Sequence, residues 1–202
     1  AYESISGDGL IVYTNTAGYD KRVHYRIVAN GIIGPEQHGP SLGNYGRMYN
    51  LIPNPKSDEI ILMVLDNDRD TRVIVWNGNS WSDKGEVSTN AQSAIYMSIA
   101  GAYLSSGNAF LVYSDNSIIP KYRIWDGSAL SAGSSLVAMQ EIPRWIKITS
   151  NPARNELLLI ANTRGDNIDA EIWDGSSWSR IVISTLDTTS ARNGIGLAYE
   201  TI

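Results

Sequence analysis

The chain has 202 residues, a formal net charge of −5 and no cysteine. This length suits one domain. The acidic balance argues against a nucleic-acid partner, which would require a face rich in Lys and Arg to displace counterions from phosphates. Without cysteine, neither a disulfide nor a thiolate metal site can form. No apolar run approaches the roughly 18 residues of a membrane-spanning helix, so we expect no membrane insertion.

A short Asn/Asp-Gly turn recurs four times along the chain at nearly constant spacing. Its glycines are separated by 47, 49 and 48 residues, and they are Gly31, Gly78, Gly127 and Gly175. A tryptophan directly precedes the last three turns, at Trp76, Trp125 and Trp173. A strand-rich repeat of about 48 residues is the period of a β-propeller blade. The spacing therefore predicts a β-propeller.

The apolar runs between the turns fit strands, and they recur in the same order in each repeat. In chain order, strands are expected at 10–13 and 23–28, then at 48–52, 59–65, 71–76 and from 81 onward, then at 109–113 and 121–125, and finally at 156–160 and 169–173. Helical periodicity and capping boxes are missing. The sequence therefore predicts an all-β chain with almost no helix.

The two ends of the chain suggest how the propeller closes. The first repeat lacks its first strand, whereas a surplus apolar stretch at 194–199 follows the fourth. Closing a ring with strands from both termini would hide two sheet edges. We therefore expect four blades of four antiparallel strands, with the C-terminal strand completing blade one: residues 1–43 plus 194–202, then 44–92, 93–141 and 142–193. The alternative is a half-ring that pairs with a second chain into eight blades.

The tryptophans divide into two groups. Trp76, Trp125 and Trp173 stand before the turns and are expected to fill the space between neighbouring blades. Trp81 and Trp178 lie just past the turns on the outer strands. They are the candidate ligand-binding residues, because an exposed aromatic face can stack on a sugar ring.

The repeat, with its run Trp173-Asp-Gly-Ser-Ser-Trp178-Ser, resembles the repeats of fungal and bacterial fucose-binding lectins. The resemblance implies six-bladed propellers with sugar sites between blades. In that family an Arg in the second strand and a Glu three residues before the Trp of Trp-Asp-Gly hold the sugar. The matching positions here are Ile11, Leu111, Tyr122 and Ala170. The resemblance supports the fold and argues against fucose binding. Hemopexin-like domains also match in blade count, but they close with a disulfide.

The run from Asp66 to Asp70 alternates carboxylates as a calcium loop does. Its sixth position is Thr71 and its twelfth is Asn77, where such a loop has Gly and Glu. The stretch also lies between two predicted strands. A solvated turn is therefore the favoured interpretation, and no metal site is predicted.

Neither of the chain's two histidines, His24 and His38, has a third metal ligand or a catalytic partner at a recognisable spacing. Glu59 and Glu156 recur before the second strands, which favours structural repetition over a paired-carboxylate glycosidase. No serine lies in a Gly-x-Ser-x-Gly elbow. The sequence therefore predicts no catalytic residues, no cofactor and no enzyme activity, and a glycosidase-like hydrolase is the least favoured alternative.

A composition low in charge and rich in Ser, Asn, Gly, Tyr and Trp is typical of secreted or cell-surface β proteins. The first hypothesis is a non-enzymatic extracellular or cell-surface module that binds a protein partner or itself, as in a surface assembly, filament or adhesin. The alternative is a carbohydrate-binding lectin whose glycan sites lie between blades and use Trp81 and Trp178.

Overall fold

The structure is a computed structural model that describes residues 1–15, 20–165, 167–181 and 194–200. Every regular element in these ranges is a β-strand. The strands form four antiparallel sheets of four strands each. The first sheet contains β1 (Gly9–Tyr13), β2 (Arg22–Ala29), β3 (Ile32–Ile33) and β4 (Gln37–Ser41). The second contains β5 (Gly46–Pro53), β6 (Ile60–Asp66), β7 (Thr71–Trp76) and β8 (Trp81–Ser88).

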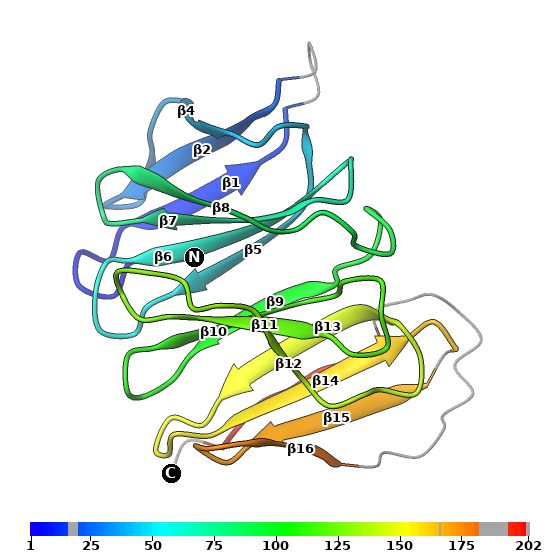
Figure 1. Ribbon diagram of the computed structural model, residues 1–202. Coiled ribbons are helices and arrows are strands. Elements are labelled where there is room, and N and C mark those ends of the chain that lie inside the picture. The colour runs from blue at the N-terminus through cyan, green and yellow to red at the C-terminus, as the bar shows by residue number, and fades with distance from the viewer. Residues whose placement is uncertain (16–19, 166, 182–193, 201–202) are drawn as a thin grey trace.

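The third sheet contains β9 (Ile99–Tyr103), β10 (Ala109–Tyr113), β11 (Lys121–Trp125) and β12 (Ser134–Ser135). The fourth contains β13 (Pro143–Ser150), β14 (Leu157–Thr163), β15 (Ile168–Trp173) and β16 (Trp178–Ile181). Figure 1 shows the four sheets following one another in chain order, as successive blades do. The first strands line one side, where β5 contacts β9 and β9 contacts β13. The all-β prediction and the four-strand repeat are confirmed.

The turns that mark the repeat adopt the predicted backbone conformation. Gly31, Gly78, Gly127 and Gly175 have φ values of 75°, 90°, 94° and 102°, a region that favours glycine. The preceding residue closes the turn from its side chain. Asp174 Oδ1, for example, accepts hydrogen bonds from the amides of Ser176 and Ser177 at 2.8 and 2.9 Å. This explains why Asp or Asn recurs before the glycine.

The core lies between neighbouring sheets, and β6 shows how it is built. Every residue of β6 is buried, and alternate side chains point to opposite faces. Leu62 and Val64 pack against the first sheet. Ile61 and Met63 pack against the third. The nearly continuous apolar run in the sequence therefore reflects a strand covered on both faces.

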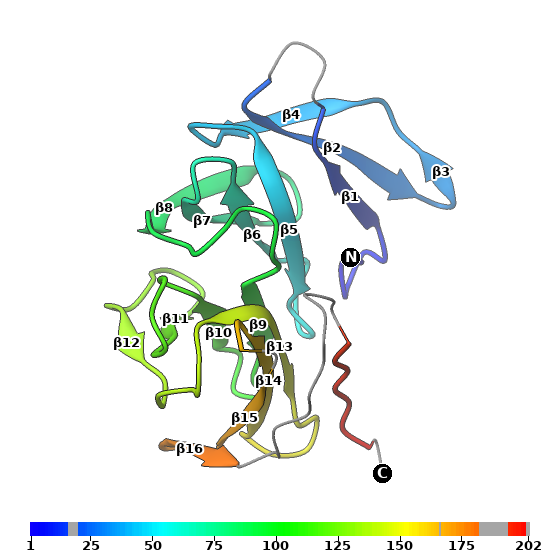
Figure 2. The ribbon, with the colours of Figure 1, turned by 90° about the vertical axis from the view of Figure 1, so that its right-hand side faces the viewer.

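The predicted closure of blade one is not what the structure shows. Residues 194–200 form no strand and join none of the sheets. The inner edge of β1 is instead met by the start of the chain, where Leu10 N donates to Ala1 O at 2.8 Å. Both views place the first and fourth sheets at opposite ends of the described structure (Figures 1 and 2).

The C-terminal segment lies beside the fourth sheet. The Lys147 Nζ donates to Ile195 O at 2.6 Å. Burial and the neighbouring Glu156 carboxylate raise the pKa of Tyr199 to about 12. Between the second and third sheets a tyrosine makes a hydrogen bond to a glutamate, where Tyr103 OH donates to Glu59 at 2.6 Å. The segment is thus held against the fourth sheet, at the opposite end of the described structure from the first sheet.

Candidate functional site

The two predicted ligand-binding tryptophans occupy equivalent positions at two different boundaries. Trp81 lies between the first and second sheets, with its ring centroid 5.6 Å from Tyr25. Trp178 lies between the third and fourth sheets, with its ring centroid 6.1 Å from Tyr122. Each also contacts the tryptophan of its own turn, at 5.2 Å for Trp76 and 5.7 Å for Trp173. The structure does not bring Trp81 and Trp178 together.

Neither candidate presents an open stacking face. Both side chains are half-buried and pack against the apolar clusters between sheets. Among the turn tryptophans, Trp76 and Trp125 are each 2% exposed, as expected for core residues, whereas Trp173 is half-buried. Trp81 and Trp178 are therefore only partly accessible to a ligand.

The boundary between the third and fourth sheets also carries charged groups that the sequence analysis missed. Asp169 and Glu171 project from β15, and Arg180 pairs opposite Glu171 on β16. Arg180 forms an ion pair with Asp169. Glu171 accepts a hydrogen bond from Val137 N at 3.1 Å. Burial raises the pKa of Glu171 to about 7. The sequence did contain one sign of these groups, since Asp169 and Glu171 alternate in a strand that was expected to be buried.

Four buried polar atoms at this boundary make no hydrogen bond within the described part of the chain. Trp173 Nε1 belongs to the turn tryptophan, and the other three are Glu171 Oε1, Arg180 Nε and Trp178 Nε1. Buried polar groups are normally paired, and an unpaired group costs about 1–3 kcal/mol. One acceptor and two donors thus gather beside the half-buried rings of Trp178 and Tyr122. We call this set, made of Tyr122, Glu171, Trp178 and Arg180, the aromatic-polar site.

The family's sugar clamp is missing from the structure as well as from the sequence. Leu111 and Ala170 are buried in the core, and Tyr122 is half-buried. Ile11 is 42% exposed and lies on the first sheet, away from the aromatic-polar site. The Glu and Arg of the aromatic-polar site therefore do not lie at the clamp positions of the fucose-binding lectins. Glu171 is one residue after Ala170, and Arg180 is two residues after Trp178.

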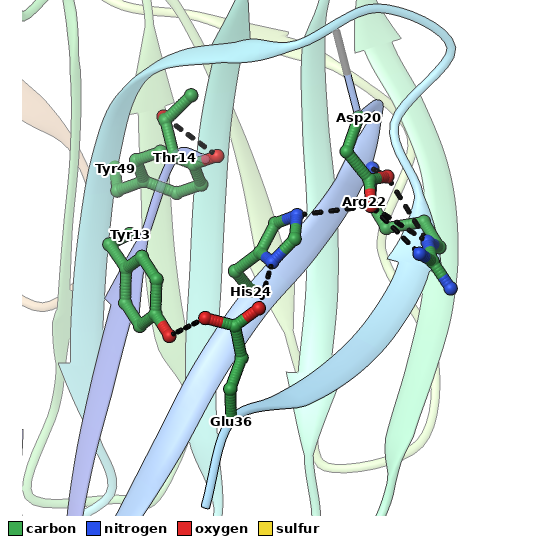
Figure 3. Close-up of polar contacts among 7 residues, drawn as sticks. All are labelled: Tyr13, Thr14, Asp20, Arg22, His24, Glu36 and Tyr49. Atoms are coloured by element: carbon green, nitrogen blue, oxygen red, sulfur yellow. Dashed lines mark hydrogen bonds and ion pairs between the residues drawn. The ribbon is translucent and has the colours of Figure 1, made fainter. Parts of the chain in front are cut away.

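A second polar cluster lies on the first sheet and includes both histidines. Figure 3 shows the part of it around His24. His24 is 1% exposed, and its two ring nitrogens face two carboxylates. Nδ1 lies 3.1 Å from Glu36 Oε1, and Nε2 lies 3.2 Å from Asp20 Oδ2. The ring of His38 meets that of His24 edge-on, with centroids 4.7 Å apart. The pairing of β2 with β4 thus gives His24 neighbours that its spacing in the sequence did not reveal.

The cluster continues outward on both sides of His24. Tyr13 OH donates to Glu36, and Arg26 Nε lies 3.3 Å from the same phenol oxygen. On the other side, Arg22 binds Asp20 through two nitrogens, with Nη2 at 2.8 Å from Oδ2. The hydrogen bonds from Arg22 hold the pKa of Asp20 well below its usual range. Asp20 is therefore a carboxylate at neutral pH.

The remaining sequence candidates have structural roles. Asp66 Oδ1 accepts the amides of Asp68 and Asp70 at 2.9 and 3.0 Å, so the acidic run forms the predicted turn. Glu59 accepts hydrogen bonds from Tyr103 and Trp125. Glu156 accepts one from Asn151 at 3.3 Å.

No protein-family model matches the chain, and no curated protein matches it. The structure is similar to that of a lectin from the fungus Aleuria aurantia, described as a six-bladed β-propeller with a novel fucose recognition mode. The TM-score is 0.60 at 14% identity, over 93% of this chain and 59% of the lectin. It is also similar to AofleA from Arthrobotrys oligospora, with a TM-score of 0.60 at 9% identity, over 89% of this chain and 55% of that one.

The NanB sialidase of Streptococcus pneumoniae matches 81% of this chain and 27% of its own, with a TM-score of 0.58 at 9% identity. The chain thus spans less than two thirds of the length of the lectins it matches. These likenesses identify the fold as that of β-propeller blades. The described residues include no apolar helix of membrane-spanning length.

Proposed function

We propose that the protein is a non-enzymatic carbohydrate-binding module whose glycan contacts the aromatic-polar site between the third and fourth sheets. The observation that carries this proposal is the set of unpartnered atoms, Glu171 Oε1, Arg180 Nε and Trp178 Nε1, beside two half-buried aromatic rings. The likeness to propeller lectins supports it, because the Aleuria aurantia lectin binds fucose with the same fold.

The chemistry of the site suits an uncharged sugar. Sugar hydroxyls both donate and accept hydrogen bonds, so a sugar can accept one from the partly exposed Arg180. Glu171 is fully buried, so it can accept a hydrogen bond from the sugar only after the neighbouring Arg180 side chain moves aside. The apolar face of a sugar can contact the exposed part of the half-buried Trp178 and Tyr122 side chains. The Arg180 side chain is 28% exposed, which makes it the group that a glycan meets first. Because the Glu and Arg differ in position from the family's clamp, the preferred sugar is expected to differ from fucose.

The proposal places the protein outside the cell or on its surface, where complex glycans are found. The test is a glycan array with the labelled protein, followed by calorimetry with the best ligand. Arg180→Gln is expected to weaken binding about tenfold, the effect of losing a hydrogen bond from a charged group. Arg72→Gln is the matched control. Arg72 makes a comparable cross-strand ion pair with Asp83, but on the second sheet. An empty array, or equal weakening by both variants, would contradict the proposal.

A second candidate function is self-association, and one observation favours it. Apolar side chains are exposed on the face of the first sheet that points away from the second, including Tyr2 at 69%, Ile11 at 42% and Ile33 at 60%. Tyr2 lies against Gly9 and Val28 of this face, and Ile33 pairs opposite Val28. The proposed occupant is a second copy of the chain. Light scattering should then show a dimer that Ile33→Glu converts to a monomer, whereas a wild-type monomer at all concentrations would exclude this function.

A further inference from the structure

We propose that Asp20, His24 and His38 form a binding site for a first-row divalent transition-metal ion, with zinc as the ion that suits it. The site lies on the first sheet, far in the fold from the aromatic-polar site, and it is independent of the proposed glycan binding. The potential ligand atoms of the three residues all lie within 4.8 Å of one another. Two of them come from neighbouring strands and the third from the residues that lead into β2.

The sheet register brings the two imidazoles together. His24 of β2 and His38 of β4 are directly opposite each other in the antiparallel pair. Directly opposed side chains have Cβ atoms about 4.5–5.5 Å apart, which allows both rings to reach one ion. In a tetrahedral zinc site with bonds of about 2.0–2.1 Å, neighbouring ligand atoms are about 3.4 Å apart. The distance of 3.2 Å between His24 Nε2 and Asp20 Oδ2 is close to this ligand–ligand separation.

The surroundings of His24 hold its ring in the orientation that a metal ligand requires. Glu36 lies 3.1 Å from Nδ1, and Tyr13 donates to the other oxygen of Glu36 (Figure 3). With a carboxylate as its partner, Nδ1 carries the proton, and Nε2 presents a lone pair toward Asp20 and His38. A carboxylate behind the imidazole is the usual outer contact of a metal-bound histidine.

The His24 Nε2 atom is buried and makes no well-aligned hydrogen bond, although it lies near Asp20. Two lone pairs that face each other in a buried setting repel unless a positive charge lies between them. Either a proton on Nε2 or a metal ion supplies that charge. The nearby His38 imidazole favours the metal ion. It brings a third ligand atom to the same place, whereas a proton would be shared by His24 and Asp20 alone.

Arg22 is the group that opposes metal binding. Its guanidinium lies 2.8 Å from the same Asp20 oxygen that faces His24. A divalent ion at this oxygen would be repelled by the guanidinium or would displace it. The Arg22 side chain is 49% exposed, so it can swing into solvent at little cost. Removing its charge should therefore tighten metal binding.

The ligand set selects among cations. Two imidazole nitrogens and one carboxylate oxygen match zinc and its first-row neighbours, with one position left for water. Calcium takes six to eight oxygen ligands and is a poor match. His38 is exposed, so an ion can enter without unfolding the sheet.

The test is calorimetric titration of the metal-stripped full chain with ZnCl₂, and with CaCl₂ in parallel. One zinc per chain with a micromolar or lower Kd is expected, with calcium at least 100-fold weaker. His38→Gln should weaken zinc binding at least tenfold, and Arg22→Gln should strengthen it. Ser41→Ala is the matched control, because Ser41 is exposed on the same strand and offers no metal ligand. His38→Gln is chosen over His24 variants because the buried His24 also supports the fold.

Co²⁺ gives a second readout, since a bound tetrahedral ion develops visible absorption that should be absent in His38→Gln. Three results would overturn the proposal: no zinc heat, unchanged zinc affinity in His38→Gln, or calcium binding as tight as zinc binding. Loss of zinc binding would leave glycan binding unaffected, so the two proposals fail separately.

Discussion

The indole nitrogen of Trp125 donates a hydrogen bond to the Glu59 carboxylate, 3.0 Å away across the boundary between the second and third sheets. Tyr103 donates to the same carboxylate oxygen at 2.6 Å. The boundary before it has a related contact, in which Trp76 Nε1 donates to Glu3 at 2.5 Å. At these two boundaries a carboxylate thus fixes a turn tryptophan, whereas Trp173 Nε1 makes no hydrogen bond among the described residues.

Replacing Glu59 with Ala is expected to lower the free energy of unfolding by about 3–6 kcal/mol. The substitution removes a charged acceptor from two donors at once, and each such hydrogen bond contributes about 1.5–3 kcal/mol. Urea denaturation measures the change. Glu86→Ala is the control, since the half-exposed Glu86 pairs with Arg72 and should contribute about 0–1 kcal/mol. Equal effects of the two substitutions would show that the Glu59 contacts do not hold the sheets together.

Gly101→Ala is expected to destabilise the centre of the molecule by about 1–3 kcal/mol, the usual cost of overpacking. A Cβ at this position of β9 would collide with Ile52 Cδ1 and lie 2.9 Å from Leu111 Cδ2. Thermal unfolding of the variant measures the loss. Gly196→Ala serves as the control, because a Cβ there meets no atom within 4 Å. A Gly101 variant as stable as wild type would mean that β5 and β9 are not in close contact.

The buried carboxyl group of Glu171 should make stability fall as the pH rises. Burial raises its pKa to about 7 in the folded state, against about 4.3 when unfolded. Between these pH values the folded chain holds a proton that the unfolded chain has released. The contribution of Glu171 to the free energy of unfolding is therefore fully present below pH 4.3 and is lost as the pH rises through 7. At 1.36 kcal/mol per pH unit, the loss is at most about 4 kcal/mol.

The measurement is urea denaturation of wild type and Glu171→Gln at several pH values between 4 and 8. The amide mimics the protonated acid, so the variant should become the more stable protein at pH 8. Taking the difference between the two proteins removes the contribution of the other carboxylates. A difference that stays constant with pH would show that folding does not change the pKa of Glu171.

Much of the fold could be predicted from the sequence because the repeat combines two independent signals. The turn glycines require positive φ, and the strands between them alternate or run apolar according to their burial. The strand predicted at 71–76 matches β7, and that at 121–125 matches β11. The position of the C-terminal segment could not be predicted, because its sequence fits an inner strand of any blade. The hydrogen bond from Lys147 Nζ to Ile195 O holds it beside the fourth sheet.

The polar sites were harder to predict because they depend on cross-strand register. His24 and His38 are 14 residues apart, a spacing with no motif behind it, and only the pairing of β2 with β4 places them face to face. Arg180 lies opposite Glu171 for the same reason. Trp81 and Trp178 were found from their place in the repeat, but their half-burial depends on the neighbouring sheet.

The most direct test of the proposed glycan site is ¹⁹F NMR of the protein labelled with 5-fluorotryptophan, titrated with the glycan that gives the strongest array signal. The chain contains six tryptophans, and single Trp→Phe variants assign their resonances. Binding at the aromatic-polar site predicts a large shift for Trp178 and little change for Trp76 or Trp125. A spectrum that does not change at saturating glycan, or a shift confined to Trp81, would contradict it.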